Sequence, residues 1–249
     1  MPESVEVIDD DSVRIIRMNR PEKKNALTQP MYAAMTAALA EAGKSDAIRC
    51  VMFAGVPGAF SAGADISEFL ESAKTGALRP RTIEFLNALA TSGKPMVAAV
   101  GGLAVGIGTT MLFHCDHVVA STDAKFSTPF SRLGLIPEAA SSLLAPLRMG
   151  YARAFALLVM GRQMSAAEAK EAGLVNTVVD PAIVDATALQ AAREIASLPP
   201  GAVAVARRLM RGATDNVMAQ IETEVAHFKE RLQSAEARAA FEGFLARKK

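Results

Sequence analysis

The sequence has little cysteine, few aromatic residues and almost no excess charge. Its 249 residues include two cysteines, no tryptophan and two tyrosines, and the formal net charge is +1. Cys50 and Cys115 each lie inside an apolar segment and form no C-x-x-C pair, so we expect two reduced, buried thiols. The balanced charge creates no long-range field that would attract nucleic acid or an anionic membrane. General polyanion binding is therefore not expected.

Targeting and membrane signals are also missing from the sequence. Residues 1–6 are acidic and lack the apolar core of a signal peptide. No apolar run reaches the roughly 18 residues that a membrane-spanning helix requires. The last residues do not spell the peroxisomal address S-K-L. We expect a cytoplasmic protein with no membrane or nucleic-acid partner.

Apolar residues make up 51% of the chain, enough to bury a full-sized core. Segments typical of strands alternate with segments of helical periodicity, which predicts a layered α/β architecture. The expected strands are residues 5–8, 13–18, 48–54, 95–100, 116–120 and 174–179, and the expected helices are 28–43, 81–89, 106–113 and 150–160. Beyond residue 181 the chain is expected to be helical, so we divide it into a core of residues 1–195 and a helical part of residues 196–249.

Several well-known catalytic and cofactor signatures are absent. The sequence contains no G-x-S-x-G elbow and no H-E-x-x-H zinc motif, and residues 106–111 lack the third glycine of a dinucleotide fingerprint. The run His114-Cys115-Asp116-His117 contains metal-ligating residue types. It lies, however, where an apolar helix meets an apolar strand, so we expect packed and hydrogen-bonded core groups there. No metal site is predicted.

Two loops of small residues, 58–65 and 101–108, are the strongest candidates for a functional site. Each follows a predicted strand and leads into a predicted helix, where backbone N–H groups are free and the helix dipole is positive. Small residues allow a ligand to approach the backbone closely. Either loop alone is compatible with an ordinary strand-to-helix turn. Together they suggest two N–H donors that converge on one oxygen, which is an oxyanion hole.

Five segments resemble one known family in both order and spacing. They are residues 19–27 (N-R-P-E-K-K-N-A-L), 60–66, 102–108, 126–138 and 161–175, and they resemble the crotonase, or enoyl-CoA hydratase/isomerase, superfamily. The resemblance implies an α/β fold with a crotonase-like β-β-α spiral core and a helical C-terminal trimerisation region. It also implies a homotrimer or a dimer of trimers, an acyl-CoA thioester substrate and no separate cofactor, since coenzyme A enters as part of the substrate.

The same resemblance assigns roles to particular residues. It implies that the thioester oxygen accepts hydrogen bonds from the backbone N–H groups of Ala64 and Ile107. Coenzyme A is expected to bend around residues 24–26 and 62–66, while residues 67–80 border the acyl end and Arg247, Lys248 and Lys249 are candidates for the adenosine end. The implied substrate-binding residues are Lys24, Ala26, Ala62, Gly63, Asp65, Ile66, Gly106, Pro129, Phe130 and Leu133.

The positions of carboxylates distinguish the reactions within the family. Hydratases carry two glutamates that hold a water molecule, and the matching positions here are Thr110 and Phe130, which cannot act as carboxylates. A different acid, Glu138, follows the run L-G-L-I-P, and this pattern resembles the peroxisomal-type Δ3,Δ2-enoyl-CoA isomerases, in which that glutamate is the catalytic base. Its apolar sequence neighbours are expected to raise its pKa toward the range of a general base. We therefore predict that Glu138 shuttles a proton from C2 to C4 of a 3-enoyl-CoA.

Three alternatives to this isomerase remain open. The chain could be an enoyl-CoA hydratase if another acid, such as Glu68, enters the site. It could isomerise ring-bearing or branched acyl-CoAs with the same Glu138. It could also bind acyl-CoA without catalysis, in which case Glu138 would simply be an exposed acid at the start of the following helix.

Overall fold

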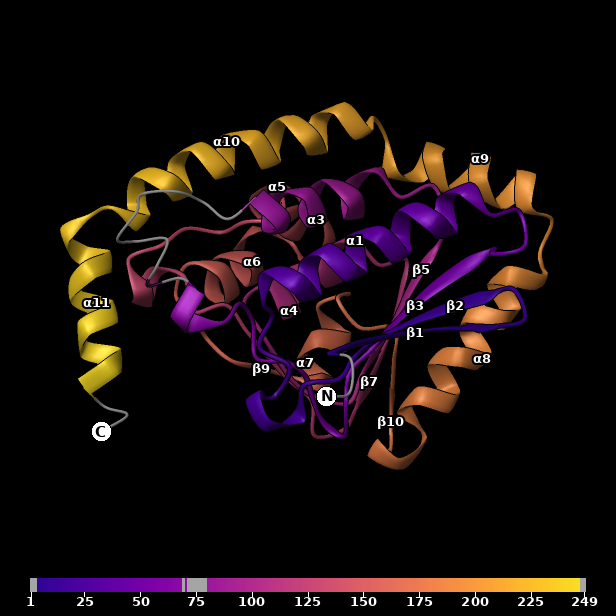
Figure 1. Ribbon diagram of the computed structural model, residues 1–249, viewed down its shortest axis with the longest axis horizontal. Coiled ribbons are helices and arrows are strands. Elements are labelled where there is room, and N and C mark those ends of the chain that lie inside the picture. Colours follow the sequence, from indigo (N-terminus) through magenta and orange to yellow (C-terminus); the bar gives the residue numbers. More distant parts are fainter. Residues whose placement is uncertain (1–3, 69, 71–79, 247–249) are drawn as a thin grey trace.

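The computed structural model describes residues 4–68, 70 and 80–246 of the chain, which form two sheets surrounded by helices (Figure 1). The larger sheet has the order β1 (Val5–Asp10), β2 (Val13–Met18), β3 (Cys50–Ala54), β5 (Met96–Val100), β7 (His117–Ser121) and β10 (Thr177–Val179). The smaller sheet has the order β4 (Gly58–Ser61), β6 (Gly102–Val105), β8 (Lys125–Ser127) and β9 (Met164–Ser165).

From β3 to β8, consecutive strands alternate between the two sheets, and this confirms the predicted β-β-α spiral. β3, β5 and β7 are parallel neighbours in the larger sheet, and the strands that follow them, β4, β6 and β8, are parallel neighbours in the smaller one. A helix follows the first two pairs, α3 (Pro80–Thr91) after β4 and α4 (Ile107–Thr110) after β6. Because β4, β6 and β8 lie side by side, the segments that lead from each of them into the next element also lie next to one another.

Both faces of the larger sheet are covered, which explains why its central strands are apolar throughout. Every residue of β3 and of β5 is buried. One face packs against α1 (Gln29–Lys44) and α3, and the other packs against the alanine-rich face of α8 (Val184–Ser197). Strands buried on both faces lose the alternation of polar and apolar residues.

The structure corrects one expectation about the glycine-rich loops, because each contains a short strand. β4 and β6 pair in parallel with Gly58 opposite Gly102. A Cβ atom on Gly102 would lie 2.3 Å from the carbonyl carbon and oxygen of Gly58, and Gly102 has a φ of +116°. Only glycine permits this approach, and glycine and alanine have low strand propensity. The small residues that allow β4 and β6 to pair are therefore also the reason why the sequence does not predict these two strands.

The remaining helical elements lie mainly in the second half of the chain. They are α5 (Ser141–Met149), α6 (Tyr151–Leu158), α7 (Ala166–Glu171), α9 (Pro200–Arg211), α10 (Thr214–Leu232) and α11 (Ala235–Ala246), with 3-10 turns η1 (Pro21–Lys23), η2 (Met111–His114), η3 (Ser131–Leu133) and η4 (Pro181–Ile183). A capping box formed by Ser165 and Glu168 opens α7. Across the described ranges, none of the helices is long and apolar enough to cross a membrane.

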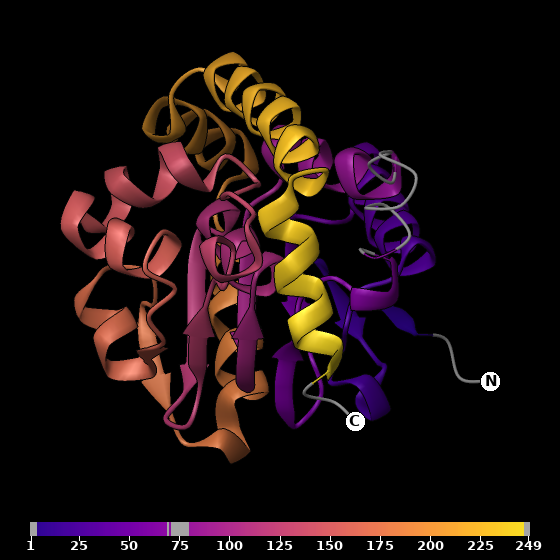
Figure 2. The ribbon, with the colours of Figure 1, turned by 90° about the vertical axis from the view of Figure 1, so that its left-hand side faces the viewer.

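The C-terminal helices pack onto the core of the spiral. Figures 1 and 2 show α10 lying across the top of the molecule, over α3 and α5, with α11 descending along one side. α10 buries Ile221, Phe228 and Leu232 in the main apolar cluster. α10 and α11 therefore share the apolar core of the spiral, and the role of residues 196–249 in oligomerisation stays a prediction.

Candidate active site

The first loop is fastened to the segment before α1 by three backbone hydrogen bonds. The N–H of Ala62 donates to the carbonyl of Lys24 (2.8 Å), that of Leu27 to Gly63 (2.8 Å) and that of Asp65 to Leu27 (2.9 Å). This pattern skips the N–H of Ala64, which has no acceptor within the described part of the chain. The loop is thus held rigidly on both sides of one free donor.

Asn25 is the buried centre of this arrangement. Its side-chain amide donates to the carbonyls of Ala59 (3.0 Å) and Phe60 (3.1 Å), and its Oδ1 accepts from the backbone N–H of Arg20 (2.7 Å). Asn25 is fully buried with a φ of +56°, in the left-handed region that asparagine tolerates better than most residues. Sequence reasoning passed over this side chain, although its place before Ala26 and Leu27 in the family-like segment was a usable signal.

Asp65, expected to bind substrate, contributes to the loop through an ion pair. Its Oδ2 lies 2.7 Å from Nη1 of Arg20, which also donates to the carbonyl of Ala26 (2.9 Å). Lys24 is exposed at the outer edge, and Ala62 and Ile66 are partly buried beside it. The expected coenzyme A segments 24–26 and 62–66 therefore lie side by side on the surface.

The second loop lies directly against the first. A Cβ atom on Gly63 would lie 2.9 Å from the carbonyl oxygen of Val105, and one on Gly108 would lie 2.9 Å from the carbonyl oxygen of Ser61. Gly106, with a φ of +54°, donates its N–H to Ser127 (2.8 Å) and precedes Ile107, the first residue of α4. The N–H of Ile107 likewise has no acceptor within residues 4–68, 70 and 80–246. Two adjacent loops thus each present one free backbone donor.

Glu138 is connected to the second loop through α4. The hydroxyl of Thr110, the last residue of α4, donates to Oε1 of Glu138 at 2.5 Å. Thr110 lies about 4.5 Å along the helix axis from Ile107, at ~1.5 Å per residue. The carboxyl group is therefore one helical turn from a free N–H donor. Thr110 was noticed in the sequence only as a missing glutamate, and its role as the partner of Glu138 was missed.

The surroundings of Glu138 change its acidity. Burial raises the pKa of this carboxyl to about 8, the hydroxyl of Thr110 acts in the lowering direction, and the negative charge of Glu224 raises the pKa further. The expected upward shift is therefore present. A carboxyl with a pKa near neutrality is partly ionised at physiological pH, so it can both accept and return a proton.

The segment before Glu138 pairs with the second loop through β8 and then turns through η3. Strand β8 pairs with β6, and the residues after it form η3, in which the N–H of Leu135 donates to the carbonyl of Phe130 (2.9 Å). Phe130 is buried, and Pro129 and Leu133 are partly buried on the same turn. The position at which hydratases carry their second glutamate thus holds a buried phenyl ring.

Glu68, considered as a second acid for a hydratase, is bonded at the start of α1. Both of its carboxylate oxygens accept from the backbone N–H of Gln29, at 3.1 and 3.2 Å. Thr28 occupies the expected N-cap position, but its side chain makes no capping hydrogen bond, and Glu68 takes that role. The carboxylate is therefore already used in the helix cap.

Tyr32 was missed by sequence reasoning. Its hydroxyl is buried and has no hydrogen-bond partner among the described residues. Burial raises the pKa of this phenol, and the negative charges of Glu138 and Glu68 raise it further. The Tyr32 hydroxyl is therefore a neutral hydrogen-bond donor at the border of the site. Because Tyr32 lies among apolar residues of α1, the sequence gives no sign of this role.

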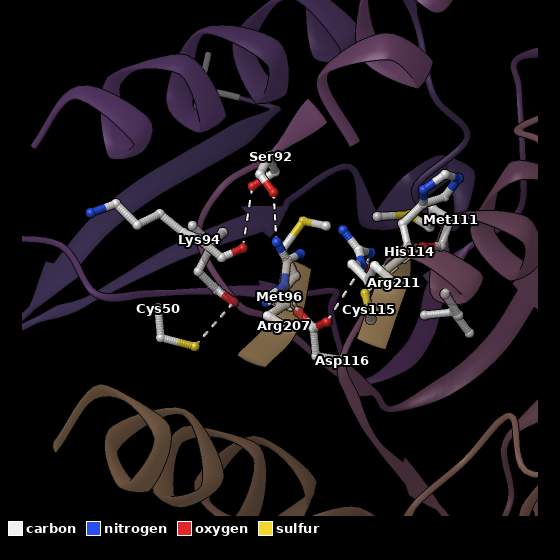
Figure 3. A network of polar contacts seen from close by, with 12 residues as sticks. Cys50, Ser92, Lys94, Met96, Met111, His114, Cys115, Asp116, Arg207 and Arg211 are labelled. Carbon is white, nitrogen blue, oxygen red and sulfur yellow. Dashed lines mark hydrogen bonds and ion pairs between the residues drawn. The ribbon is translucent and has the colours of Figure 1, made fainter. Parts of the chain in front are cut away.

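The His114–His117 run forms part of a structural network (Figure 3). Nε2 of His114 lies 2.8 Å from the carbonyl oxygen of Ala139, and burial lowers the pKa of this histidine to about 4. Asp116 pairs with Arg207 of α9 at 2.8 Å. Cys50 and Cys115 are free and buried, as expected. In the described ranges no three potential ligands gather into a metal-binding group.

Two expected regions of the site lie outside the described residues. Arg247, Lys248 and Lys249, the candidates for the adenosine end, fall there, as do residue 69 and residues 71–79 of the segment expected at the acyl end.

Comparisons with known proteins show which family the chain resembles. The family model for "Enoyl-CoA hydratase/isomerase" matches residues 9–249. The chain is 36% identical to rat "Enoyl-CoA delta isomerase 2" over 97% of its own length, but it spans only 63% of that relative. It is 33% identical to "1,2-epoxyphenylacetyl-CoA isomerase" of Escherichia coli K12, covering 95% of this chain and 93% of the relative.

A solved structure is similar over almost the whole chain. The crystal structure of an enoyl-CoA hydratase/isomerase from Pseudoalteromonas atlantica T6c superposes with a TM-score of 0.93 at 40% identity, covering 98% of both chains.

Proposed function

Because the chain belongs to the enoyl-CoA hydratase/isomerase family, we propose that it shifts the double bond of a 3-enoyl-CoA to the trans-2 position. The observation that carries this proposal is the contact between Thr110 and Glu138. It connects a single carboxyl, whose pKa burial raises to about 8, to the helix that begins at the free N–H of Ile107. The coarser assignment, an acyl-CoA enzyme of this family, does not depend on which reaction occurs.

The proposed mechanism uses one base and two backbone donors. The thioester oxygen accepts from the N–H groups of Ala64 and Ile107. Ionised Glu138 removes a proton from C2, and the electrons of that C–H bond pass to the thioester oxygen, giving a dienolate that the two donors stabilise. Glu138 then returns the proton to C4: the C3–C4 π electrons form the new C–H bond, the C1–C2 π electrons of the dienolate move to C2–C3, and an electron pair of the oxygen restores the thioester carbonyl. No water and no resident cofactor are consumed.

Three features argue against water addition. Thr110 and Phe130 occupy the positions of the two hydratase glutamates, and Glu68 is bonded to the first turn of α1. Phe130 is buried in the apolar cluster beside the turn that leads to Glu138. An apolar wall excludes the nucleophile that would compete with proton return.

A second candidate is the same chemistry on a ring-bearing acyl group. The likeness to the Escherichia coli 1,2-epoxyphenylacetyl-CoA isomerase, which covers nearly all of both chains, favours it. The two candidates are separated by offering purified protein a straight-chain trans-3-enoyl-CoA and a ring-bearing acyl-CoA and comparing kcat/KM. Binding of both without turnover of either would contradict catalysis and favour a non-catalytic acyl-CoA-binding protein.

The activity is expected to depend on the ionisation of Glu138. As a base the carboxyl must be ionised, so kcat/KM for trans-3-enoyl-CoA should rise with pH and level off above a midpoint near the pKa of about 8. The measurement is a pH–rate profile from about pH 5 to 10. A profile that is flat above about pH 6 would mean that no carboxyl of raised pKa takes part.

We also propose that the protein is a homotrimer or a dimer of trimers. Large apolar side chains are exposed on α5, α6 and α9, including Leu147 (76% exposed), Tyr151 (72%) and Met210 (89%). Exposed apolar surface of this kind marks interaction sites. Light scattering on purified protein should give three or six times the chain mass of 26.2 kDa. A single-chain mass at micromolar concentration would contradict this proposal.

A further inference from the structure

We propose that Glu224, a buried glutamate of α10, is a positioning residue that fixes the backbone beside Glu138 in the conformation needed for proton transfer. This inference rests on the proposed role of Glu138 as the base. Glu224 is only 4% exposed, although it lies in the middle of a 19-residue helix whose other acidic residues face solvent. A buried carboxylate is unfavourable unless donors satisfy it.

Both oxygens of Glu224 are satisfied by the segment that follows Glu138. Oε2 accepts from the backbone N–H of Ala140 at 2.7 Å. Oε1 accepts from the backbone N–H of Ser142 at 3.0 Å and from its hydroxyl at 2.5 Å. No basic side chain of the described residues pairs with Glu224, so its charge is held by the N-terminal donors of α5, where the helix dipole also favours an anion.

The backbone that Glu224 holds has an unusual conformation. Ala139 and Ala140 have φ values of +61° and +53°, in the left-handed region that residues with a side chain rarely adopt. His114 fixes the same pair from the opposite side through the carbonyl of Ala139. Two consecutive left-handed alanines persist only where surrounding contacts enforce them. Glu138 immediately precedes this pair, so its direction depends on them.

The N-terminal end of residues 134–142 is also held by the C-terminal helices. Nε of Arg231, also on α10, donates to the carbonyl of Gly134 at 3.2 Å, and a Cβ atom on Gly134 would lie 2.6 Å from the backbone nitrogen of Ala237 in α11. Helix α10 thus contacts both ends of residues 134–142, and α11 packs against the end at Gly134. Figure 2 shows these two helices running along one side of the molecule. The C-terminal helices therefore take part in building the site of Glu138.

Glu224 also acts on Glu138 through its charge. After burial and the opposing effect of Thr110, its negative charge is the third influence on the pKa of Glu138, in the raising direction. Two further ionisable groups beside this segment are Tyr32, whose pKa burial and the charge of Glu138 raise well above its usual value, and His114, whose pKa burial lowers to about 4. Both are uncharged near neutral pH. Burial raises the pKa of Glu224 itself as well, and the donors of Ser142 and Ala140 act in the lowering direction. Where Glu224 is ionised, removing its charge is expected to move the pKa of Glu138 downward.

The test compares Glu224→Gln with Glu222→Gln, which removes the same charge from an exposed position of the same helix. Glutamine offers one oxygen where two are used, and its NH2 group opposes one N–H donor of α5. We expect kcat for trans-3-enoyl-CoA to fall at least about tenfold with KM changed less than about twofold, because Glu224 does not touch the two loops. The midpoint of the pH–rate profile should move to lower pH. Glu222→Gln should match the wild type in all three quantities.

A readout that needs no turnover separates this inference from the proposed reaction. Hydrogen exchange of the amides in residues 135–144 of the resting protein should be faster in Glu224→Gln and unchanged in Glu222→Gln. If the wild type fails to isomerise 3-enoyl-CoA, the proposed function is wrong, and the exchange result alone decides whether Glu224 holds the loop.

A milder variant covers the case in which Glu224→Gln does not fold. Ser142→Ala removes one of the three donors to Glu224 and leaves both backbone bonds, so a smaller fall in kcat is expected. Wild-type kcat, pH profile and amide exchange in Glu224→Gln would overturn the proposal. If it does not fold, the same result in Ser142→Ala would do so.

Discussion

Replacing Glu138 by glutamine is expected to lower kcat for trans-3-enoyl-CoA by about 10²- to 10⁴-fold, the usual contribution of a positioned general base. Glutamine has nearly the same shape, and its amide oxygen can still accept the hydroxyl of Thr110, but it cannot carry a proton between C2 and C4. KM should change little, because the two backbone donors and the coenzyme A segments remain in place. Steady-state kinetics with the purified variant measures the effect.

The control for this variant is again Glu222→Gln, which should retain full activity. Thermal unfolding should show that Glu138→Gln is folded, since the substitution removes a carboxyl whose ionisation is opposed by burial. Isomerase activity in Glu138→Gln within a few-fold of the wild type would contradict its assignment as the base. The pH dependence near 8 should also disappear, because no other group with that pKa is assigned to proton transfer.

Substituting Gly63 by alanine is expected to lower kcat/KM by about 10²- to 10³-fold, the typical cost of losing one oxyanion-hole donor. The new Cβ atom would lie 2.9 Å from the carbonyl oxygen of Val105, and the φ of +89° is unfavourable for alanine. The two loops must separate or twist, which moves the N–H of Ala64 away from the thioester oxygen. The same kinetic assay measures the loss.

A matched glycine provides the control for Gly63→Ala. Gly43 lies near the end of α1, where a Cβ atom would meet nothing within 4 Å, so Gly43→Ala should leave activity unchanged and slightly stabilise the helix. A Gly63→Ala variant that folds and retains wild-type kcat/KM would show that the contact between the loops is not needed for stabilising the dienolate.

The sequence predicted the architecture because its signals are local and repeated. β2 begins and ends at the predicted residues, and the alternation of strands with helices led directly to the observed α/β fold. Short helices and strands were harder to predict from the sequence. β4 and β6 contain several small residues that allow the two chains to approach closely. The predicted helix 106–113 is also shorter than expected, since α4 ends after one turn and residues 111–113 belong to the 3-10 turn η2.

Within the candidate site, the sequence pointed to the groups proposed to face the substrate, but not to the side chains that hold them in place. Glu138 and the two loops were found through segments contiguous in the chain. Thr110 lies 28 residues from Glu138, and Glu224 lies 84 residues from Ala140. No periodicity or local motif connects such partners, since only the folded chain brings them together. In the sequence, Glu224 differs from the other acidic residues of α10 only in lying three residues after Ile221 and four residues before Phe228, on the face that the structure buries.

Measuring the mass of the product formed from trans-3-enoyl-CoA tests most directly whether the protein isomerises this substrate without adding water. Purified protein is incubated with this substrate, and the product is analysed by mass spectrometry and by the ultraviolet absorbance of the conjugated thioester. A dienolate mechanism with Glu138 as the only proton carrier predicts a product of unchanged mass that carries the conjugated chromophore. A first product heavier by one water molecule and without that chromophore would contradict it.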